Sequence, residues 1–239
     1  MTNIEIFDIF PTTIYSNKVL HHEKYKKAFY DVYSKYDYEQ QTICENGEEW
    51  YNTTSENTGN PYIHLDENLT EIFDEVIENV KTYVHDVLEY EDIFDFIITK
   101  SWLSRARAPY ENIQWHNHAN SDISFTYYLN TPPNSHRLRF SNEENINGLL
   151  AGLNKSDIKD AVRNTNKHNA STFHMNPQEG SIVLFPSSLA HSTDNARDFV
   201  GERLAIVGDV ILVFKKDGDN DYSMGYLHPK YWKLYEGKK

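Results

Sequence analysis

The longest regular pattern in the chain is a helical one that runs from Asp66 to Tyr90. Apolar residues recur there every three or four positions, the spacing that puts them on one face of an α-helix. They are Leu69, Ile72, Phe73, Val76, Ile77, Val80, Val84, Val87 and Leu88. Asp66 can act as the N-cap, because a carboxylate accepts hydrogen bonds from the unpaired N–H groups at a helix start. The pattern predicts an amphipathic helix that lies against the outside of a sheet.

The residues before this helix contain shorter patterns. Residues 4–15 (IEIFDIFPTTIY) resemble an opening strand. A helix is predicted over His22–Tyr36, where Tyr25, Phe29 and Val32 keep helical spacing. Residues 37–64 are rich in Glu, Asn, Gly and Thr, and they are predicted to form a loop.

After Tyr90 the apolar period falls to two, and β-branched and aromatic residues dominate. The predicted strands are Phe94–Leu103, Ile123–Leu129, Arg137–Phe140, Ser181–Phe185 and Arg203–Phe214. Turn signals between them are Pro132, Pro133, Pro177, Gly180 and Pro186. Helices followed by strands with turns between them favour an α+β chain built on an antiparallel sandwich or jelly roll.

The strands are interrupted by a polar insert over residues 141–176, which we expect to act as a lid or binding loop. Within it, Ser156 could cap a short helix over residues 157–162. The charged tail, residues 215–239, carries Tyr226, Tyr231, Trp232 and Tyr235, so we expect it to dock on the domain. The expected organisation is one domain over 1–239, with an N-terminal strand and helices in 1–92, the jelly-roll core with its insert in 93–214 and the tail in 215–239.

Composition narrows the class of protein. The chain has 239 residues, of which 39% are hydrophobic and 14% aromatic, enough for a sizeable core. Its formal net charge of −13 disfavours non-specific binding to nucleic acid or to an anionic membrane. Cys44 is the single cysteine, so a disulfide framework is excluded and a reducing compartment is favoured. Neither a signal-like N-terminus nor a membrane-length apolar run is present, and we expect a cytoplasmic protein.

Three histidines are the candidates for metal chemistry. His116 and His118 lie two positions apart just before a predicted strand, and such a pair points to one face when the backbone is extended. His191 follows the strand Ser181–Phe185 and would bring a third imidazole from a distant segment. Three imidazoles on one side of an ion leave the opposite positions open, as an oxygen-activating iron site requires. The alternative is that these are ordinary surface or buried core histidines.

Arg203 and Tyr128 are the candidates for binding an organic acid. Arg203 opens an apolar strand twelve residues after His191, and a buried guanidinium must be paired or must face a carboxylate. Its planar fork suits bidentate carboxylate binding. The alternative for this arginine is a structural ion pair, for example with Asp209 or Glu202. Tyr128 shares a predicted strand face with Ser124 and Thr126 and could add a hydroxyl, although a tyrosine at such a position is more often part of the core.

Taken with these residues, several motifs resemble the iron(II)/2-oxoglutarate-dependent oxygenase superfamily, especially a branch found in marine bacteria and phages. The motifs are IFPTTIY near the N-terminus, Ser101-Trp102, HNHANSDIS at His116–Ser124, YYLNTPP at Tyr127–Pro133, LRF at Leu138–Phe140, and GSIVLFPSSLAH…R from Gly180 to Arg203. The resemblance implies a double-stranded β-helix, a jelly-roll variant, with N-terminal helices outside it. It also implies Fe(II) held by a His-x-acid…His pattern and 2-oxoglutarate held by Arg203, with Tyr128 matching a strand tyrosine that contacts the co-substrate.

The chain departs from the superfamily pattern in one respect. No Asp or Glu stands two positions after His116 or His118, where the pattern has its carboxylate ligand. His118 could take the place of this carboxylate, Asp122 could swing in beside His118, or the site could be degenerate. We favour three histidines. That ligand set also describes catalytic zinc sites, so it leaves the metal open.

Three functional hypotheses follow. The first is an Fe(II)- and 2-oxoglutarate-dependent oxygenase that hydroxylates a small-molecule or peptide substrate. The second, motivated by the missing carboxylate, is a jelly-roll module that binds a metal or ligand without turnover. The third is a zinc-dependent hydrolase or lyase. The substrate and the oligomeric state cannot be derived from the sequence.

Overall fold

The structure, a computed structural model, describes Ile6, Asp8 and residues 11–37, 42–45, 48–51, 61–141, 163–215 and 229–233. Its larger sheet is antiparallel, in the order β1-β8-β5-β10-β4. The strands of this sheet are β1 (Tyr15–Lys18), β4 (Phe94–Ala106), β5 (Ile123–Asn130), β8 (Ser181–Pro186) and β10 (Arg203–Phe214). A smaller antiparallel sheet has the order β7-β6-β9, with β6 (Leu138–Ser141), β7 (Thr172–Met175) and β9 (His191–Thr193). A separate hairpin joins β2 (Thr42–Glu45) and β3 (Glu48–Tyr51).

Helical segments precede the main strands. The two α-helices are α1 (His22–Val32) and α2 (Thr70–Lys81). Short 3-10 turns cover Tyr33–Lys35, Ile63–Leu65, Glu67–Leu69 and Pro229–Tyr231, and a π-helical turn at Thr82–Val87 extends α2. Among the described residues, no helix is both long enough and apolar enough to cross a bilayer.

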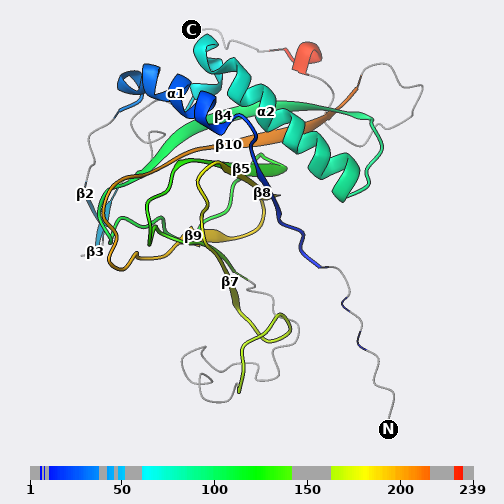
Figure 1. Ribbon diagram of the computed structural model, residues 1–239. Coiled ribbons are helices and arrows are strands. Elements are labelled where there is room, and N and C mark those ends of the chain that lie inside the picture. Colours follow the sequence, from blue (N-terminus) through cyan, green and yellow to red (C-terminus); the bar gives the residue numbers. More distant parts are fainter. Residues whose placement is uncertain are drawn as a thin grey trace, which may run out of the picture.

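The layers place the helices and the smaller sheet on opposite faces of the larger sheet (Figure 1). One hydrophobic cluster lies on the helix side and joins α1 and α2 to Phe125, Tyr127 and Leu129 of β5. A second cluster lies between the two sheets and includes Tyr128 of β5 with Phe140 of β6. The prediction of an α+β chain with facing antiparallel sheets and outer helices is confirmed.

The central strand β5 is buried on both faces because it is covered from both sides. Every residue from Ile123 to Leu129 is buried. The odd positions Phe125 and Tyr127 face the helices, whereas Tyr128 packs in the cluster between the sheets. Alternation with a period of two therefore separates an apolar helix-facing side from a side that carries hydroxyl groups.

The predicted helix from Asp66 onward is confirmed as one helical run. Asp66 caps its first 3-10 turn, because the Oδ1 atom of Asp66 accepts a hydrogen bond of 3.0 Å from the backbone N–H of Asn68. Its apolar face is buried, including Leu69, Ile72, Phe73, Val76 and Val80. The earlier helix also forms, with Tyr25, Phe29 and Val32 buried.

Several predictions of local structure were wrong. The opening strand begins at Tyr15, and residues 11–14 are not in a strand; most of residues 4–10 lie outside the described part. The register explains this late start: Tyr15 lies opposite Leu184, only two residues before β8 ends at Pro186, which has no N–H to donate.

The loop predicted over 37–64 contains the hairpin β2–β3 and a 3-10 turn. In the insert, β7 forms at Thr172–Met175, and the predicted helix over 157–162 lies outside the described residues. In the tail, Trp232 is 57% exposed, and Tyr226 and Tyr235 lie outside the described part, so the docking of the tail stays a prediction.

Gly208 lies at a point of β10 where the neighbouring strands leave no space for a side chain. A Cβ atom there would lie 2.6 Å from the Lys100 carbonyl oxygen and 2.6 Å from the Phe125 ring. We expect Gly208→Ala to lower the free energy of unfolding by about 1–3 kcal/mol, the usual effect of overpacking. Urea unfolding monitored by circular dichroism measures this change.

The same alanine should destabilise less in a Phe125→Leu background, because the smaller side chain removes one of the two clashes. An unfolding midpoint for Gly208→Ala equal to that of the wild type would contradict this account of β10.

Candidate metal centre

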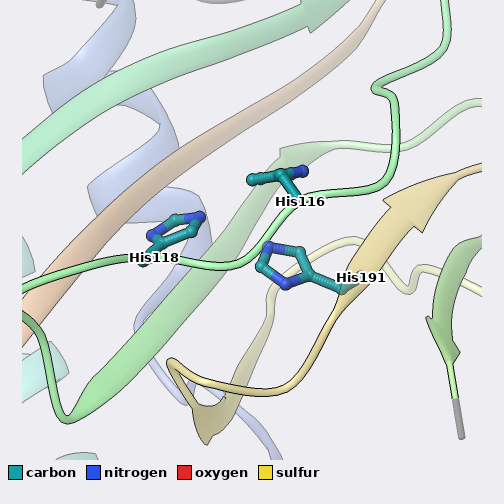
Figure 2. Close-up of side chains that lie close together, drawn as sticks. All are labelled: His116, His118 and His191. Atoms are coloured by element: carbon teal, nitrogen blue, oxygen red, sulfur yellow. The ribbon is translucent and has the colours of Figure 1, made fainter. Parts of the chain in front are cut away.

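Three imidazoles from two remote segments meet at one end of the space between the sheets. His116 and His118 lie in the irregular segment between β4 and β5, and His191 opens β9. Their ring centroids are 4.2 Å apart for His116 and His191, 5.0 Å for His118 and His191, and 5.1 Å for His116 and His118. One ring nitrogen from each histidine lies within 4.8 Å of the other two. Figure 2 shows the three side chains gathered around one point.

Backbone hydrogen bonds fix where these side chains start. The backbone N–H of His116 donates to the carbonyl of His191 at 3.0 Å, and the N–H of His191 donates back to the carbonyl of His116 at 2.8 Å. Residues paired in this way in an antiparallel bridge carry their side chains on the same side. The N–H of His118 donates to the carbonyl of Ser187 at 2.9 Å, which holds the second histidine beside the end of β8.

Each imidazole is oriented through its Nδ1 atom. The Nδ1 of His116 lies 2.8 Å from the carbonyl of Gln114, and that of His191 lies 2.9 Å from the carbonyl of Leu189. The Nδ1 of His118 lies 2.5 Å from the Oδ1 atom of Asp209. A carbonyl or carboxylate oxygen can only accept, so each Nδ1 atom is the hydrogen-bond donor and each Nε2 atom is the ring nitrogen that can serve as a metal ligand. Three imidazoles oriented in this way are a donor set that suits a divalent transition metal.

His191 is held in its neutral form. It is 5% exposed, and its ring lies 4.7 Å from the ring of Phe185. Burial, reinforced by the neighbouring imidazoles of His116 and His118, lowers the pKa of His191 to about 3. A metal would therefore not have to displace a proton from this ligand near neutral pH.

Asp209 is a residue beside the cluster that the sequence interpretation considered only as an ion-pair partner for Arg203. Its carboxylate is fully buried; Oδ1 accepts hydrogen bonds from His118 and from the hydroxyl of Ser124, at 2.9 Å, and Oδ2 lies 3.3 Å from the Nζ atom of Lys100. Burial alone would raise the pKa of Asp209, but the hydrogen bond from His118 and the nearby charges of His118 and Lys100 hold it below its ordinary value. The sequence feature that could have drawn attention to Asp209 is its position inside an otherwise apolar strand, on the same face as Arg203.

The carboxylate of Asp122 lies elsewhere. Its Oδ2 atom accepts a hydrogen bond of 2.8 Å from the backbone N–H of Leu212. The group of potential ligands found in the described residues contains His116, His118 and His191 without Asp122. The geometry therefore favours three histidines over a ligand set that includes this aspartate.

Arg203 and Tyr128 lie outside the histidine cluster, farther along the same interior. Arg203 is 2% exposed, and its Nη2 atom donates a hydrogen bond of 2.9 Å to the hydroxyl of Ser104. Tyr128 is 1% exposed; burial raises the pKa of its hydroxyl to about 12, and the charge of Arg203 partly offsets this effect. The two groups thus lie close enough to influence one another.

The two carboxylates named as alternative partners for Arg203 also bind other residues. Asp209 pairs with His118 and Lys100, and the Oε1 atom of Glu202 accepts from the Nε atom of Arg107 at 2.7 Å. Tyr128 also contributes to the inter-sheet cluster with Phe140 and Phe185, and Phe185 in turn contacts His191. Phe185 thus links the cluster that contains Tyr128 to one of the three histidines.

The part of the chain that holds this centre matches one family model. Residues 100–209, which hold all three histidines, Tyr128, Arg203 and Asp209, match the family described as "Putative 2OG-Fe(II) oxygenase". No curated protein matches the chain. The family match agrees with the resemblance carried by the sequence motifs.

Solved structures with this fold are similar at low sequence identity. AviO1 from Streptomyces viridochromogenes Tue57 is 11% identical, with 83% of this chain and 89% of that chain covered and a TM-score of 0.52. HygX from Streptomyces hygroscopicus, with nickel and 2-oxoglutarate bound, is 10% identical, with 83% and 82% covered and a TM-score of 0.51. SnoN, a non-heme alpha-ketoglutarate-dependent epimerase from nogalamycin biosynthesis, is 10% identical, with 84% and 78% covered and a TM-score of 0.51. The fold is a double-stranded β-helix, as predicted.

His136, a buried histidine near Arg203 that is not part of the cluster, is expected to make the free energy of unfolding depend on pH. His136 is 0% exposed, and its ring lies 5.1 Å from that of Phe199. Burial, reinforced by the charge of Arg203, lowers the pKa of His136 to about 4. An unfolded histidine titrates near 6.5, so the unfolded state binds more protons between these values. The stability due to a neutral His136 is complete above pH 6.5 and is lost as the pH falls toward 4.

We expect His136→Gln to make the unfolding free energy less sensitive to acid. Between pH 7.5 and 5.5 the wild type should lose about 1 kcal/mol more than this variant, because glutamine takes up no proton. Urea titrations of metal-free protein at both pH values measure the difference. Parallel losses in the two proteins would show that His136 does not titrate in this range.

Proposed function

We propose that this protein is an iron(II)- and 2-oxoglutarate-dependent oxygenase that hydroxylates a small-molecule or peptide substrate. The observation that carries the proposal is the convergence of His116, His118 and His191, which bring one ring nitrogen each to one place and have their Nδ1 atoms beside hydrogen-bond acceptors. The match of residues 100–209 to the oxygenase family supports iron as the metal. The overall reaction would convert 2-oxoglutarate, O₂ and a substrate R–H into succinate, CO₂ and R–OH.

The three histidines would hold the metal on one side and leave other coordination positions for 2-oxoglutarate and oxygen. Bound there, iron(II) would supply the electrons that activate O₂ and would bind the keto-acid end of the co-substrate. The side chains of this centre contribute position and charge: the carbonyls of Gln114 and Leu189 hold two of the rings, and Asp209 holds the third.

Arg203 and Tyr128 would bind the other carboxylate of 2-oxoglutarate. Arg203 brings a buried positive charge whose fork can donate two parallel hydrogen bonds, and the hydroxyl of Tyr128 remains protonated near neutral pH. A buried guanidinium gains most from an anionic partner, since water is excluded from its surroundings. The similar HygX structure holds nickel and 2-oxoglutarate together, which supports a co-substrate bound beside a metal in this fold.

Charge balance fits the same proposal. Three neutral imidazoles leave a divalent ion with its full charge, and the 2-oxoglutarate dianion can neutralise it. A site with a carboxylate ligand would already carry one negative charge before the co-substrate binds. We therefore expect the metal and 2-oxoglutarate to bind cooperatively in this protein.

The first test is turnover without knowledge of the substrate. Purified protein with Fe(II), ascorbate and 2-oxoglutarate should form succinate, the product of oxidative decarboxylation of the co-substrate. His191→Ala should abolish it, since the variant removes one of three metal ligands. His174→Ala is the matched control: His174 lies on β7, 34% exposed, and Arg139 is its register partner. Succinate measured by mass spectrometry gives the result.

Other outcomes identify the competing functions. Normal turnover by His191→Ala would contradict the ligand assignment. Tightly bound zinc with an oxygen-independent reaction would favour a hydrolase or lyase. Absence of metal, with no thermal shift from Fe(II) and 2-oxoglutarate, would favour a binding module without turnover.

The second test concerns Arg203. Arg203→Lys keeps the positive charge but loses the fork, so it should raise the KM for 2-oxoglutarate by on the order of 10- to 100-fold. Metal affinity measured without 2-oxoglutarate should stay the same, because Arg203 lies outside the histidine cluster. Arg107→Lys, at an exposed arginine paired with Glu202, is the control and should leave KM unchanged. An unchanged KM in Arg203→Lys would remove this residue from the co-substrate site.

A further inference from the structure

Asp209 lies directly behind one of the three imidazoles. Its Oδ1 atom is 2.5 Å from the Nδ1 of His118, the shortest of the three contacts that orient the histidines. The carboxylate has no exposed surface, and the side chain of His118 is 4% exposed. A hydrogen bond of this kind between two buried groups is charge-assisted and is stronger than a bond to a neutral carbonyl.

The surrounding strands are shaped to hold this carboxylate. Lys100 and Ser124 are the register partners of Asp209 on β4 and β5, and both approach its oxygen atoms. The pairing of β10 with β4 shifts between Asp209 and Val210, so that Thr99 is an extra residue on β4. Such bulges re-aim side chains next to functional sites. Here the irregularity lies at the point where β10 turns a carboxylate toward His118.

We propose that Asp209 is a positioning residue for the metal centre and supplies from behind His118 the negative charge that no carboxylate ligand supplies directly. This inference rests on the proposed function, since it takes His118 to be a ligand. By accepting the Nδ1 proton, Asp209 fixes the tautomer of His118 and increases the electron density at its Nε2 atom. The three ligands of the metal would then carry no charge themselves, and the negative charge near the metal would come from Asp209.

A purely structural ion pair explains the arrangement less well. Lys100 is the cation near Asp209, but its side chain is 32% exposed and its Nζ atom also lies 4.8 Å from the ring of Trp102. Burial of a carboxylate to pair it with a partly exposed lysine gains little stability. The shorter contact goes to His118, whose ring lies 5.6 Å from that of Trp102. The carboxylate is thus coupled more closely to the imidazole than to the lysine.

Asp209 and Lys100 carry opposite charges near the centre, so their removal should change the metal affinity in opposite directions. Asp209→Asn should weaken the binding of Co(II) or Ni(II) to the metal-free full-length protein by on the order of 10- to 100-fold. Lys100→Met should leave the affinity unchanged or tighten it, because it removes a positive charge near a divalent cation. Calorimetric titration measures both affinities, and the visible spectrum of bound Co(II) shows whether the ligand set is kept.

A structural role would give a different pattern, with both substitutions weakening metal binding as the site loosens. Asp122→Asn is the matched control, since it removes the same charge from a carboxylate bonded to the backbone of Leu212. We expect its metal affinity to equal that of the wild type. Ser124→Ala, which removes one hydrogen bond to Asp209 but keeps the charge, should reduce the affinity less than Asp209→Asn, and it remains available if the asparagine variant does not fold.

The outcomes separate this inference from the function on which it rests. If the wild type binds no metal, the proposed function fails. If the wild type binds metal and Asp209→Asn binds it equally well, the role of Asp209 is overturned while the three-histidine site stands. If Asp122→Asn loses metal and Asp209→Asn does not, the carboxylate that serves this centre is Asp122.

Discussion

Two backbone hydrogen bonds, exchanged between His116 and His191, are the constraint on which the candidate centre depends. They are 3.0 Å and 2.8 Å long, and they join an irregular segment to the short strand β9. Because the pairing is antiparallel, both side chains leave the backbone on the same side, and His118 needs only its own bond to Ser187 to join them. The imidazoles therefore approach one another through sheet geometry, and their rings are then fixed by the acceptors at Nδ1.

The larger sheet separates two chemical environments, and β5 shows how this is achieved. Phe125 and Tyr127 face the helices, where apolar contact holds the layers together. On the opposite side, Ser124 bonds to Asp209, and Tyr128 lies in the space between the sheets. One strand with a period of two thus contributes to the hydrophobic core and to the polar interior at the same time. Covering both faces excludes water from the polar side, which strengthens its charge interactions.

Regular periodicity made much of the fold predictable. The helical run after Asp66 and the five strands predicted after Tyr90 follow periods of 3.6 and two, and the structure contains them. β9 was not predicted, because His191–Thr193 is three residues long, has no apolar alternation and exists through its pairing with β6. The gathering of the three histidines followed from their spacing and their positions next to strands. The pairing of His118 with Asp209 could not be predicted. The alternation along β10 indicates the face on which Asp209 lies, but the strand register that places it beside the His118 ring cannot be read from the sequence.

The shortness of β9 has a consequence for how the chain closes on itself. A strand of three residues gains little stability from its own hydrogen bonds, yet it supplies one of the three imidazoles. An ion shared with His116 and His118 would act as a cross-link between β9 and the segment that precedes β5. A long stretch of chain separates these two segments, and bringing them together on folding costs loop entropy. Capture of the ion and completion of the smaller sheet would then be one event, and the cofactor would be a part of the architecture as well as of the chemistry.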